Sequence, residues 1–253
     1  MGWWSLARSI SIQPSVKHCG VQRIEIYQAS DIVSKFRVRG RTHGELPGRI
    51  DALINPSNPF LAGTKFSYFP RGGPVPPREL STSNSWGGME AGPGMLYPAQ
   101  VVDGRVTALG GRALAKQLAA IGGCPVGEAV LTDATEGLGN FFKYIIHTPP
   151  PFCETTSDQQ QAGNPQRLLL GCYRASLEIA NNHEEIKTVA TPLLGAGCAG
   201  FSLPSAALAL QEGMQEFLAA EKATSPLECV KIVVQSPWDV DTVLDVFDAF
   251  VEE

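Results

Sequence analysis

Residues 186–201 read IKTVATPLLGAGCAGF and form the centre of a strand–turn–helix unit. An apolar strand is expected at 186–191 and a helix from about residue 203 to residue 220. The glycines between them let backbone N–H groups turn toward an anion, and the N-terminus of the following helix adds positive potential. Two interpretations stay open for this turn: a cradle for a phosphate or diphosphate, and a tight connection that packs small residues.

Cys198 gives the same turn a rival interpretation as a nucleophile elbow, in which a reactive side chain sits on a sharp strand-to-helix turn. Hydrolases of that kind carry their acid and then their histidine after the nucleophile. All four histidines precede Cys198 in this chain: His18, His43, His147 and His183. The chain order therefore argues against nucleophilic catalysis by this cysteine.

Outward from the turn, strand patterns alternate with helix patterns along the chain. Further strands are expected at 21–28, 51–55, 128–132, 143–148 and 230–234. Further helices are expected at 103–121 (weakened near Gly110 and Gly111), at 165–182 with Asn164 as its cap, and from Asp239. This alternation predicts an α/β protein with helices on both faces of one sheet and a ligand site beyond the carboxyl ends of the strands.

The composition restricts the class of protein further. The chain has 253 residues, of which 43% are hydrophobic, so it can bury one sizeable core. Its net charge of −5 argues against general nucleic-acid binding, which needs a basic face. No apolar run reaches the ~18 residues that span a bilayer, so no membrane partner is expected. The six scattered cysteines lack the spacing of a zinc site, and we expect reduced thiols and no metal.

Two segments differ from the rest. Residues 1–20 are expected to form a flexible extension, and residues 1–24 weakly resemble an organelle-targeting peptide; otherwise a cytoplasmic or nuclear location is expected. Residues 56–98 hold 8 Pro and 7 Gly, a density that predicts an extended loop without a helix or a strand ladder. The sequence thus predicts a single domain over 21–253 with an insertion at about 64–100.

Four polar residues follow the predicted strands or begin a helix. Asn55 and Asn58 end the strand at 51–55, where asparagine can bind sugar hydroxyls or simply form a turn. Asp31 follows the strand at 21–28 and could accept a hydrogen bond from the exocyclic amine of a base, or cap a helix. Asp103 begins the helix after the long loop, where it could cap that helix or orient a water molecule.

Eight segments together resemble the motifs of the macro domain family, the ADP-ribose-binding module, in the family's order and from about residue 21 to residue 250. They are Ser30-Asp31-Ile32-Val33 for G-D-I-T, Asp51-Ala-Leu-Ile-Asn55-Pro-Ser-Asn58 for D-A-I-V-N-A-A-N, Phe60-Leu61-Ala62-Gly63 for the start of L-x-G-G-G, Val102-Asp103-Gly104 for V-D-G, Cys124-Pro125-Val126-Gly127-Glu128-Ala129 for C-P-T-G-E-A, Lys143-Tyr144-Ile145-Ile146-His147-Thr148 for K-Y-V-I-H-T, Leu170-Gly-Cys-Tyr173-Arg-Ala-Ser176-Leu177 for L-x-x-C-Y-x-x-S-L, and Gly195-Ala196-Gly197-Cys198-Ala199-Gly200-Phe201 for S-T-G-I-F-G-F.

The resemblance implies a three-layer α/β/α macro-type fold with a central mixed sheet, and it assigns roles to residues. The implied catalytic residues are Asp103 and Asn58: Asp103 would orient the attacking water, as in MacroD-type hydrolases, which need no metal, and Asn58 would bind the distal ribose. Asp31 would bind the adenine amine, and His147 would be structural. The implied ligand-binding residues are Asp31, Ile32, Asn55, the turn residues Gly195, Ala196, Gly197, Cys198, Ala199, Gly200 and Phe201, with backbone N–H groups of the first four on the diphosphate, and Trp238 stacked on adenine.

The implied activity is hydrolysis of an ADP-ribosyl bond, in mono-ADP-ribosylated protein or O-acetyl-ADP-ribose, by a monomer without a cofactor. The alternative is a reader that binds ADP-ribose or ADP-ribosylated proteins without turnover. Two departures from the family pattern bear on this choice: Gly63 and Val102 are separated by the insertion, and Ala199 replaces an aromatic residue that usually covers the distal ribose.

Overall fold

The computed structural model describes residues 7–10, 23–29, 32–33, 50–64, 69–70, 95–96, 101–153, 163–220 and 226–251. At its centre is a seven-stranded sheet in the order β1-β2-β9-β8-β3-β7-β6. Its strands are β1 (Ala7–Ile10), β2 (Arg23–Gln28), β3 (Ala52–Pro56), β6 (Val130–Asp133), β7 (Tyr144–Thr148), β8 (Thr188–Pro192) and β9 (Cys229–Val234). The five inner strands are parallel, whereas β1 and β6 are antiparallel edge strands, so the sheet is mixed as predicted.

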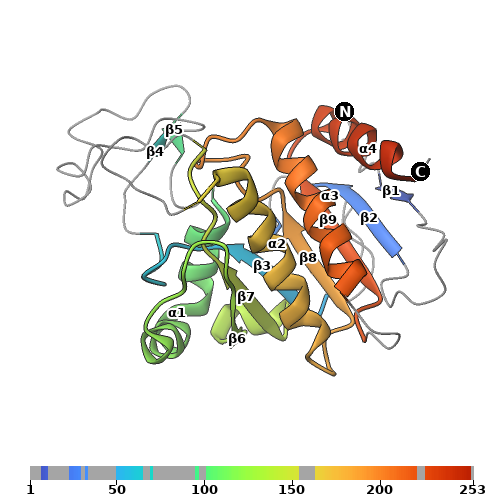
Figure 1. Cartoon of the computed structure of the whole chain (residues 1–253). Helices are drawn as coiled ribbons and strands as arrows, with labels where there is room; N and C mark the ends of the chain where they lie inside the picture. Colours follow the sequence, from blue (N-terminus) through green and yellow to red (C-terminus); the bar gives the residue numbers. More distant parts are fainter. Residues whose placement is uncertain are drawn as a thin grey trace, which may run out of the picture.

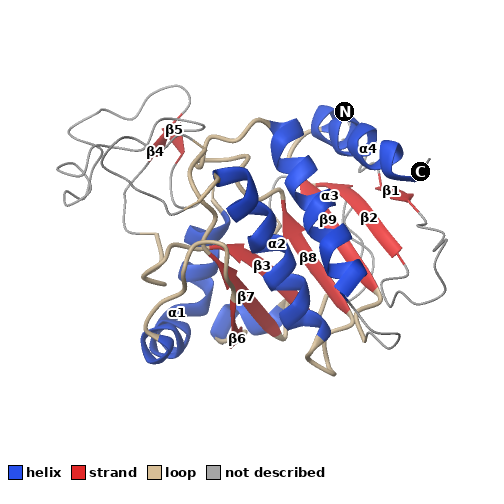
Figure 2. Cartoon of the chain, in the orientation of Figure 1, coloured by secondary structure: helices blue, strands red, loops and turns tan. Residues whose placement is uncertain are grey.

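Helices cover both faces of this sheet, which confirms the predicted α/β fold (Figure 2). They are α1 (Val102–Ile121), α2 (Pro165–Asn181), α3 (Leu203–Ala220) and α4 (Pro237–Val251), with a 3₁₀ turn η2 (Glu136–Asn140). Figure 1 shows α2 and α3 side by side across one face. Buried side chains of α4 join the core on that same face, while α1 and η2 pack on the opposite face.

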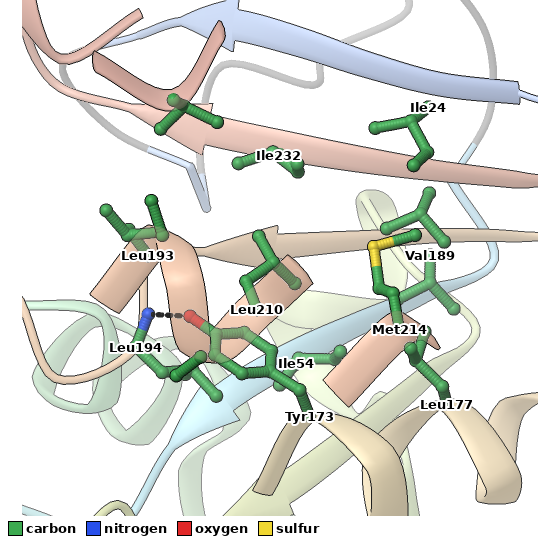
Figure 3. Close-up of a cluster of buried hydrophobic side chains, with 14 of the residues drawn as sticks. Ile24, Ile54, Tyr173, Leu177, Val189, Leu193, Leu194, Leu210, Met214 and Ile232 are labelled. Carbon is green, nitrogen blue, oxygen red and sulfur yellow. Dashed lines mark hydrogen bonds between the residues drawn. The ribbon is translucent and has the colours of Figure 1, made fainter. Parts of the chain in front are cut away.

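The five inner strands are buried on both sides because each supplies side chains to two cores. In β3, Ala52 and Ile54 face α2, α3 and α4, whereas Leu53 faces α1. Figure 3 shows side chains of the first of these cores, among them Ile54 of β3 and Tyr173 of α2. Successive side chains of a strand point to opposite faces, so an apolar run such as the one at 52–54 is expected of an inner parallel strand.

The helix α1 breaks at the pair of glycines that weakens it in the sequence. Gly111 has φ 58° and ψ −148°, so the helical path is interrupted there. Two residues at the start of η2 form hydrogen bonds with the backbone groups that the break exposes. Thr135 Oγ1 donates to the Gly110 carbonyl (2.9 Å), and a Glu136 carboxylate oxygen accepts from the Ala113 N–H (3.2 Å). The first half of α1 is thereby oriented separately from the second half.

Two short strands correct the sequence analysis. The strands β4 (Phe69–Pro70) and β5 (Met95–Leu96) pair antiparallel within the segment that was predicted to contain no ladder (Figure 2). Proline and glycine prevent long ladders, but a pair of two residues per strand needs few backbone hydrogen bonds and tolerates a proline at a strand end.

The strand β1 lies in the predicted N-terminal extension, so residues 7–10 belong to the sheet. Among the described residues, no helix is both long and apolar enough to cross a membrane.

Candidate functional site

The carboxyl ends of the five parallel strands meet at one edge of the sheet, and most of the predicted site residues follow these ends. Asn55 is the penultimate residue of β3, and Asn58 follows the strand after one intervening residue, Ser57. The glycine turn follows β8, and Trp238 follows β9. Asp31 lies outside the described residues, so its predicted contact with adenine stays a prediction.

Asp103 is the centre of a polar cluster at this edge. It is the second residue of α1, whose N-cap is Val101 without a side-chain capping bond, so the alternative role of Asp103 as a helix cap is wrong. Its carboxylate instead accepts hydrogen bonds from outside the helix: Asn55 Nδ2 donates to Oδ1 (2.9 Å), and Thr64 Oγ1 donates to Oδ2 (2.9 Å). The break in the helical path further along α1 leaves this first turn directed at the end of β3.

Burial raises the pKa of Asp103 above its ordinary value, while the hydrogen bonds from Asn55 and Thr64 act in the opposite direction. The cause is desolvation of the charged form, which the two neutral donors compensate only in part. A carboxylate in this state is a stronger base than one on the surface, which suits a group that orients a water and draws a proton from it.

His147 belongs to the same cluster, although the resemblance implied only a structural role. Asn55 Nδ2 lies 3.2 Å from His147 Nδ1, and Thr132 Oγ1 lies 2.9 Å from His147 Nε2. Burial lowers the pKa of His147 to about 4, so the imidazole is neutral at neutral pH. No local pattern could have identified this contact, because Asn55 and His147 become neighbours only through the register of β3 against β7.

Asn58 is engaged differently from the prediction of a contact with ribose. Its Nδ2 donates to the Gly63 carbonyl (2.8 Å), and its Oδ1 accepts from the N–H groups of Phe60 (3.2 Å) and Ala62 (3.3 Å). The side chain thus ties together the loop that follows β3. Its catalytic role remains a prediction, and Asn55 is the asparagine that contacts Asp103.

The turn after β8 is anchored at both ends by buried aromatic residues. Leu194 N–H donates to the hydroxyl of Tyr173 in α2 (2.6 Å), as drawn in Figure 3. At the other end, Phe201 is 6% exposed, and its N–H donates to the Gly195 carbonyl (3.1 Å). Gly195 has φ 82°, and a Cβ there would lie 2.9 Å from the Phe201 ring, so only glycine fits.

Between these anchors the tip of the turn is exposed to solvent. Gly197 is exposed, and a Cβ added to it would meet no atom within 4 Å; Ala196, Cys198, Ala199 and Gly200 are half-buried. The turn leads into the 18-residue α3, whose first turn is capped by the Ser202 hydroxyl (Ser205 N–H, 3.3 Å). A helix N-terminus behind a glycine turn is a favourable place for an anion, which leaves the phosphate interpretation intact.

The last two predicted residues differ in exposure. Trp238 is 79% exposed in the first turn of α4, where the N–H of Ser236 donates to Asp239 Oδ2 (3.1 Å) and Asp239 N–H donates back to Ser236 Oγ (3.2 Å). Ile32 is 6% exposed and belongs to the core on the α1 face. The stacking of Trp238 on adenine and the ligand contact of Ile32 stay predictions. Within the described ranges, no three His, Cys, Asp or Glu side chains gather as a metal site would require.

Known proteins share both the sequence pattern and the fold. The model of the Macro domain family matches residues 91–210. A macro domain-containing protein of Methanosarcina mazei is 37% identical over 117 residues, which cover 46% of this chain and 58% of that protein. The ADP-ribose glycohydrolase MACROD2 of Xenopus laevis is 31% identical over 117 residues, 46% of this chain and 26% of that protein. The chain thus matches less than two thirds of the length of these relatives.

Solved structures extend the likeness over nearly the whole chain. The Oceanobacillus iheyensis macrodomain with ADP superimposes with a TM-score of 0.61 at 18% identity, covering 98% of each chain. The Trypanosoma brucei macrodomain in complex with ADP gives 0.57 at 18% identity, over 94% of this chain and 74% of that one. At this identity the superpositions show the fold. The sequence likeness to the macro domain family is carried by residues 91–210, and the macrodomain fold extends over nearly the whole chain.

Proposed function

We propose that this chain binds ADP-ribose along the carboxyl edge of the sheet and hydrolyses the bond between ADP-ribose and a modified protein side chain or an acetyl group. The observation that carries the proposal is the Asp103 carboxylate, held at this edge by Asn55 and Thr64 at 2.9 Å each. Two relatives support it by their names: an ADP-ribose glycohydrolase from Xenopus laevis and a macrodomain from Oceanobacillus iheyensis with ADP.

The glycine turn supplies the binding of the diphosphate. Backbone N–H groups of the turn and the N-terminus of α3 favour an anion without a cationic side chain, although the Ala196 N–H, one of the four predicted donors, also donates to the Leu193 carbonyl (3.4 Å). The buried anchors Tyr173 and Phe201 hold the turn in shape, so less ordering is needed when the ligand binds. Trp238 offers an exposed ring just past β9, on which an adenine can stack.

Asp103 supplies the chemistry. Each of its oxygens accepts one of the two hydrogen bonds described above, and a carboxylate has about four acceptor positions, so it can also hold a water molecule. For a protein carboxylate attached to the distal ribose, the water attacks the anomeric carbon, the bond from that carbon to the carboxylate oxygen breaks, the carboxylate leaves, and the water's proton passes to Asp103 or to the substrate's diphosphate. For O-acetyl-ADP-ribose, the water attacks the acetyl carbonyl carbon, and acetate forms as the ribose oxygen leaves and takes up the proton. Proximity and orientation of this water supply much of the rate.

A second candidate function is a reader that binds ADP-ribose without turnover. The observation that favours it is the side chain of Asn58, whose amide makes three hydrogen bonds within its own loop. In this arrangement the distal ribose lacks one of the contacts that the family resemblance implies. A ribose held less firmly would keep its affinity through the diphosphate and adenine while losing the alignment that hydrolysis needs.

The test mixes the protein with mono-ADP-ribosylated proteins of known linkage and with O-acetyl-ADP-ribose, and measures released ADP-ribose by chromatography. The proposal expects release by the wild type and its loss in Asp103→Asn. Calorimetry with free ADP-ribose runs alongside. Binding without release from any substrate establishes the reader, and absence of binding contradicts both functions.

A further inference from the structure

Behind Asp103, a chain of buried polar side chains runs across three strands. Thr132 of β6 is 4% exposed, His147 of β7 is 1% exposed and Asn55 of β3 is fully buried. The contacts are Thr132 Oγ1 to His147 Nε2 (2.9 Å), His147 Nδ1 to Asn55 Nδ2 (3.2 Å) and Asn55 Nδ2 to Asp103 Oδ1 (2.9 Å). Three consecutive contacts therefore link the interior of the sheet to the candidate catalytic carboxylate.

The chemistry of the donors and acceptors fixes the direction of each hydrogen bond in this series. An ionised carboxylate accepts only, so the Asn55 amide must direct an N–H at Asp103. The second N–H of the same Nδ2 then points to His147 Nδ1, which must be unprotonated to accept it. The imidazole proton is therefore on Nε2 and is donated to Thr132 Oγ1. A single tautomer of His147 satisfies all three contacts.

The orientation of the Asn55 amide depends on its hydrogen bond to His147. Its Oδ1 is buried and has no hydrogen-bond partner among the described residues, so nothing there holds the carbonyl end of the amide. Without the acceptor on His147, rotation of the amide by half a turn would direct Oδ1 at the Asp103 carboxylate. Two acceptors would then face each other, and the water-orienting geometry would be lost.

We propose that His147 is a positioning residue for Asp103, acting through Asn55: its Nε2–H tautomer, in which Nε2–H donates to Thr132 and Nδ1 accepts from Asn55, orients the amide that orients the carboxylate. The consequence for catalysis rests on the proposed hydrolase function, whereas the effect on the orientation and protonation of Asp103 does not. The burial that keeps the imidazole neutral supports the assignment, because an imidazolium would present Nδ1–H to the Asn55 N–H.

Near-isosteric variants separate positioning from a general structural role. His147→Asn places an amide oxygen near the position of Nδ1 and can still accept from Asn55. His147→Gln places its polar atoms near Nε2, so it retains the contact to Thr132 and loses the one to Asn55. Thr132→Val removes the acceptor that stabilises the Nε2–H tautomer with little change in volume, and Thr132→Ser restores it. His183→Gln is the matched control, because His183 lies against the Tyr144 ring, outside the chain of contacts (centroids 4.4 Å apart).

The first readout is NMR and does not require turnover: the nitrogen shifts of the His147 ring and a carboxyl titration of Asp103. We expect the Nε2–H tautomer in the wild type, and a higher Asp103 pKa in His147→Gln and Thr132→Val. We expect values near wild type in His147→Asn, Thr132→Ser and His183→Gln. An Nδ1–H tautomer, or an Asp103 pKa that none of the variants moves, overturns the proposal.

The second readout is ADP-ribose release. In His147→Gln we expect kcat to fall roughly tenfold to a hundredfold, the range for losing a partner that orients a functional side chain. KM should change little, and His147→Asn should recover most of kcat. Equal losses in Gln and Asn, with KM and melting temperature changing together, show a structural role and overturn the proposal. If the wild type releases no ADP-ribose, the hydrolase function fails and the NMR readout still decides the positioning.

Discussion

At the scale of single residues, the candidate site depends on one carboxylate whose surroundings are neutral. Asn55 and Thr64 donate to Asp103, and His147 supports Asn55 without adding charge. An acid buried among neutral donors keeps a higher pKa than one beside a cation, since no opposite charge favours its ionised form. The site therefore gains basicity at Asp103 at a cost in folding stability.

Asp103→Asn separates these two effects. The variant should lose about a hundredfold or more in the rate of ADP-ribose release, because the group that orients the water is gone. Its melting temperature should equal or exceed that of the wild type: the buried charge is removed, while an amide can still accept from Asn55 and donate to Thr64. Release assays and thermal unfolding measure the two effects, and ADP-ribose affinity by calorimetry is the control. Wild-type turnover in Asp103→Asn would remove Asp103 from the mechanism.

His147 makes folding stability depend on pH. Burial lowers its pKa from 6.5 to about 4. Between these pH values the unfolded chain binds a proton at His147, and the folded chain does not. The free energy of unfolding should therefore fall as the pH is lowered from 6.5 to 4, by up to about 3 kcal/mol from this residue. The raised pKa of Asp103 acts in the opposite sense below neutral pH.

Comparison with His147→Asn isolates the contribution of His147, because Asp103 is present in both proteins. Urea unfolding at several pH values should show a smaller loss of stability on acidification in the variant than in the wild type. Parallel curves for the two proteins would mean that the imidazole does not stay neutral through this range.

At the scale of elements, the glycine turn and α3 act as one anion site. Gly197→Glu should abolish ADP-ribose binding, because its carboxylate would occupy the place of the diphosphate, and the fold should persist because Gly197 is exposed with open space around it. Calorimetry measures the affinity, and circular dichroism checks the fold. Gly197→Ala is the matched control and should bind nearly as well as the wild type. A folded Gly197→Glu that still binds ADP-ribose would locate the phosphates elsewhere.

The break in α1 is a second feature at this scale. A Cβ at Gly111 would lie 1.9 Å from a Glu136 carboxylate oxygen, and the backbone conformation there is nearly exclusive to glycine. Gly111→Ala should lower the free energy of unfolding by about 2–4 kcal/mol, from backbone strain and the lost Glu136 contact to Ala113. Denaturant unfolding measures it. Gly122→Ala, with φ 86° and no atom near the added Cβ, should cost only about 1–2 kcal/mol. Equal losses would mean that Glu136 gives way freely.

At the scale of the whole molecule, the ligand site joins elements that are distant in sequence, so binding should stabilise the entire fold. ADP-ribose at 100 times its dissociation constant should raise the free energy of unfolding by about 2.7 kcal/mol and the melting temperature by roughly 5–10 °C. Differential scanning fluorimetry measures the shift, with Gly197→Glu as a control that should show none. A wild type that melts at the same temperature with and without ligand would contradict the proposed binding.

Most elements of this fold could be predicted from the sequence, because their signals are local. The cap of α2 shows this: the Asn164 side chain accepts from the Gln166 N–H (2.9 Å), and the apolar face that follows is buried, as its spacing indicates. The position of Asn55 and of the glycine turn at strand ends followed from the same patterns. These features depend on a few adjacent residues, so the local sequence is enough to predict them.

Only the tertiary structure decided what the site residues contact. Asn55 meets Asp103 across 48 residues of sequence and His147 across 92, and both contacts require the order of β3 between β8 and β7 and the packing of α1 on that face. The same holds for Asn58, whose amide closes its own loop, and for β1, which joins the sheet edge. Hydrogen bonds between distant residues depend on strand order, register and rotamer, and no local periodicity or capping pattern encodes these.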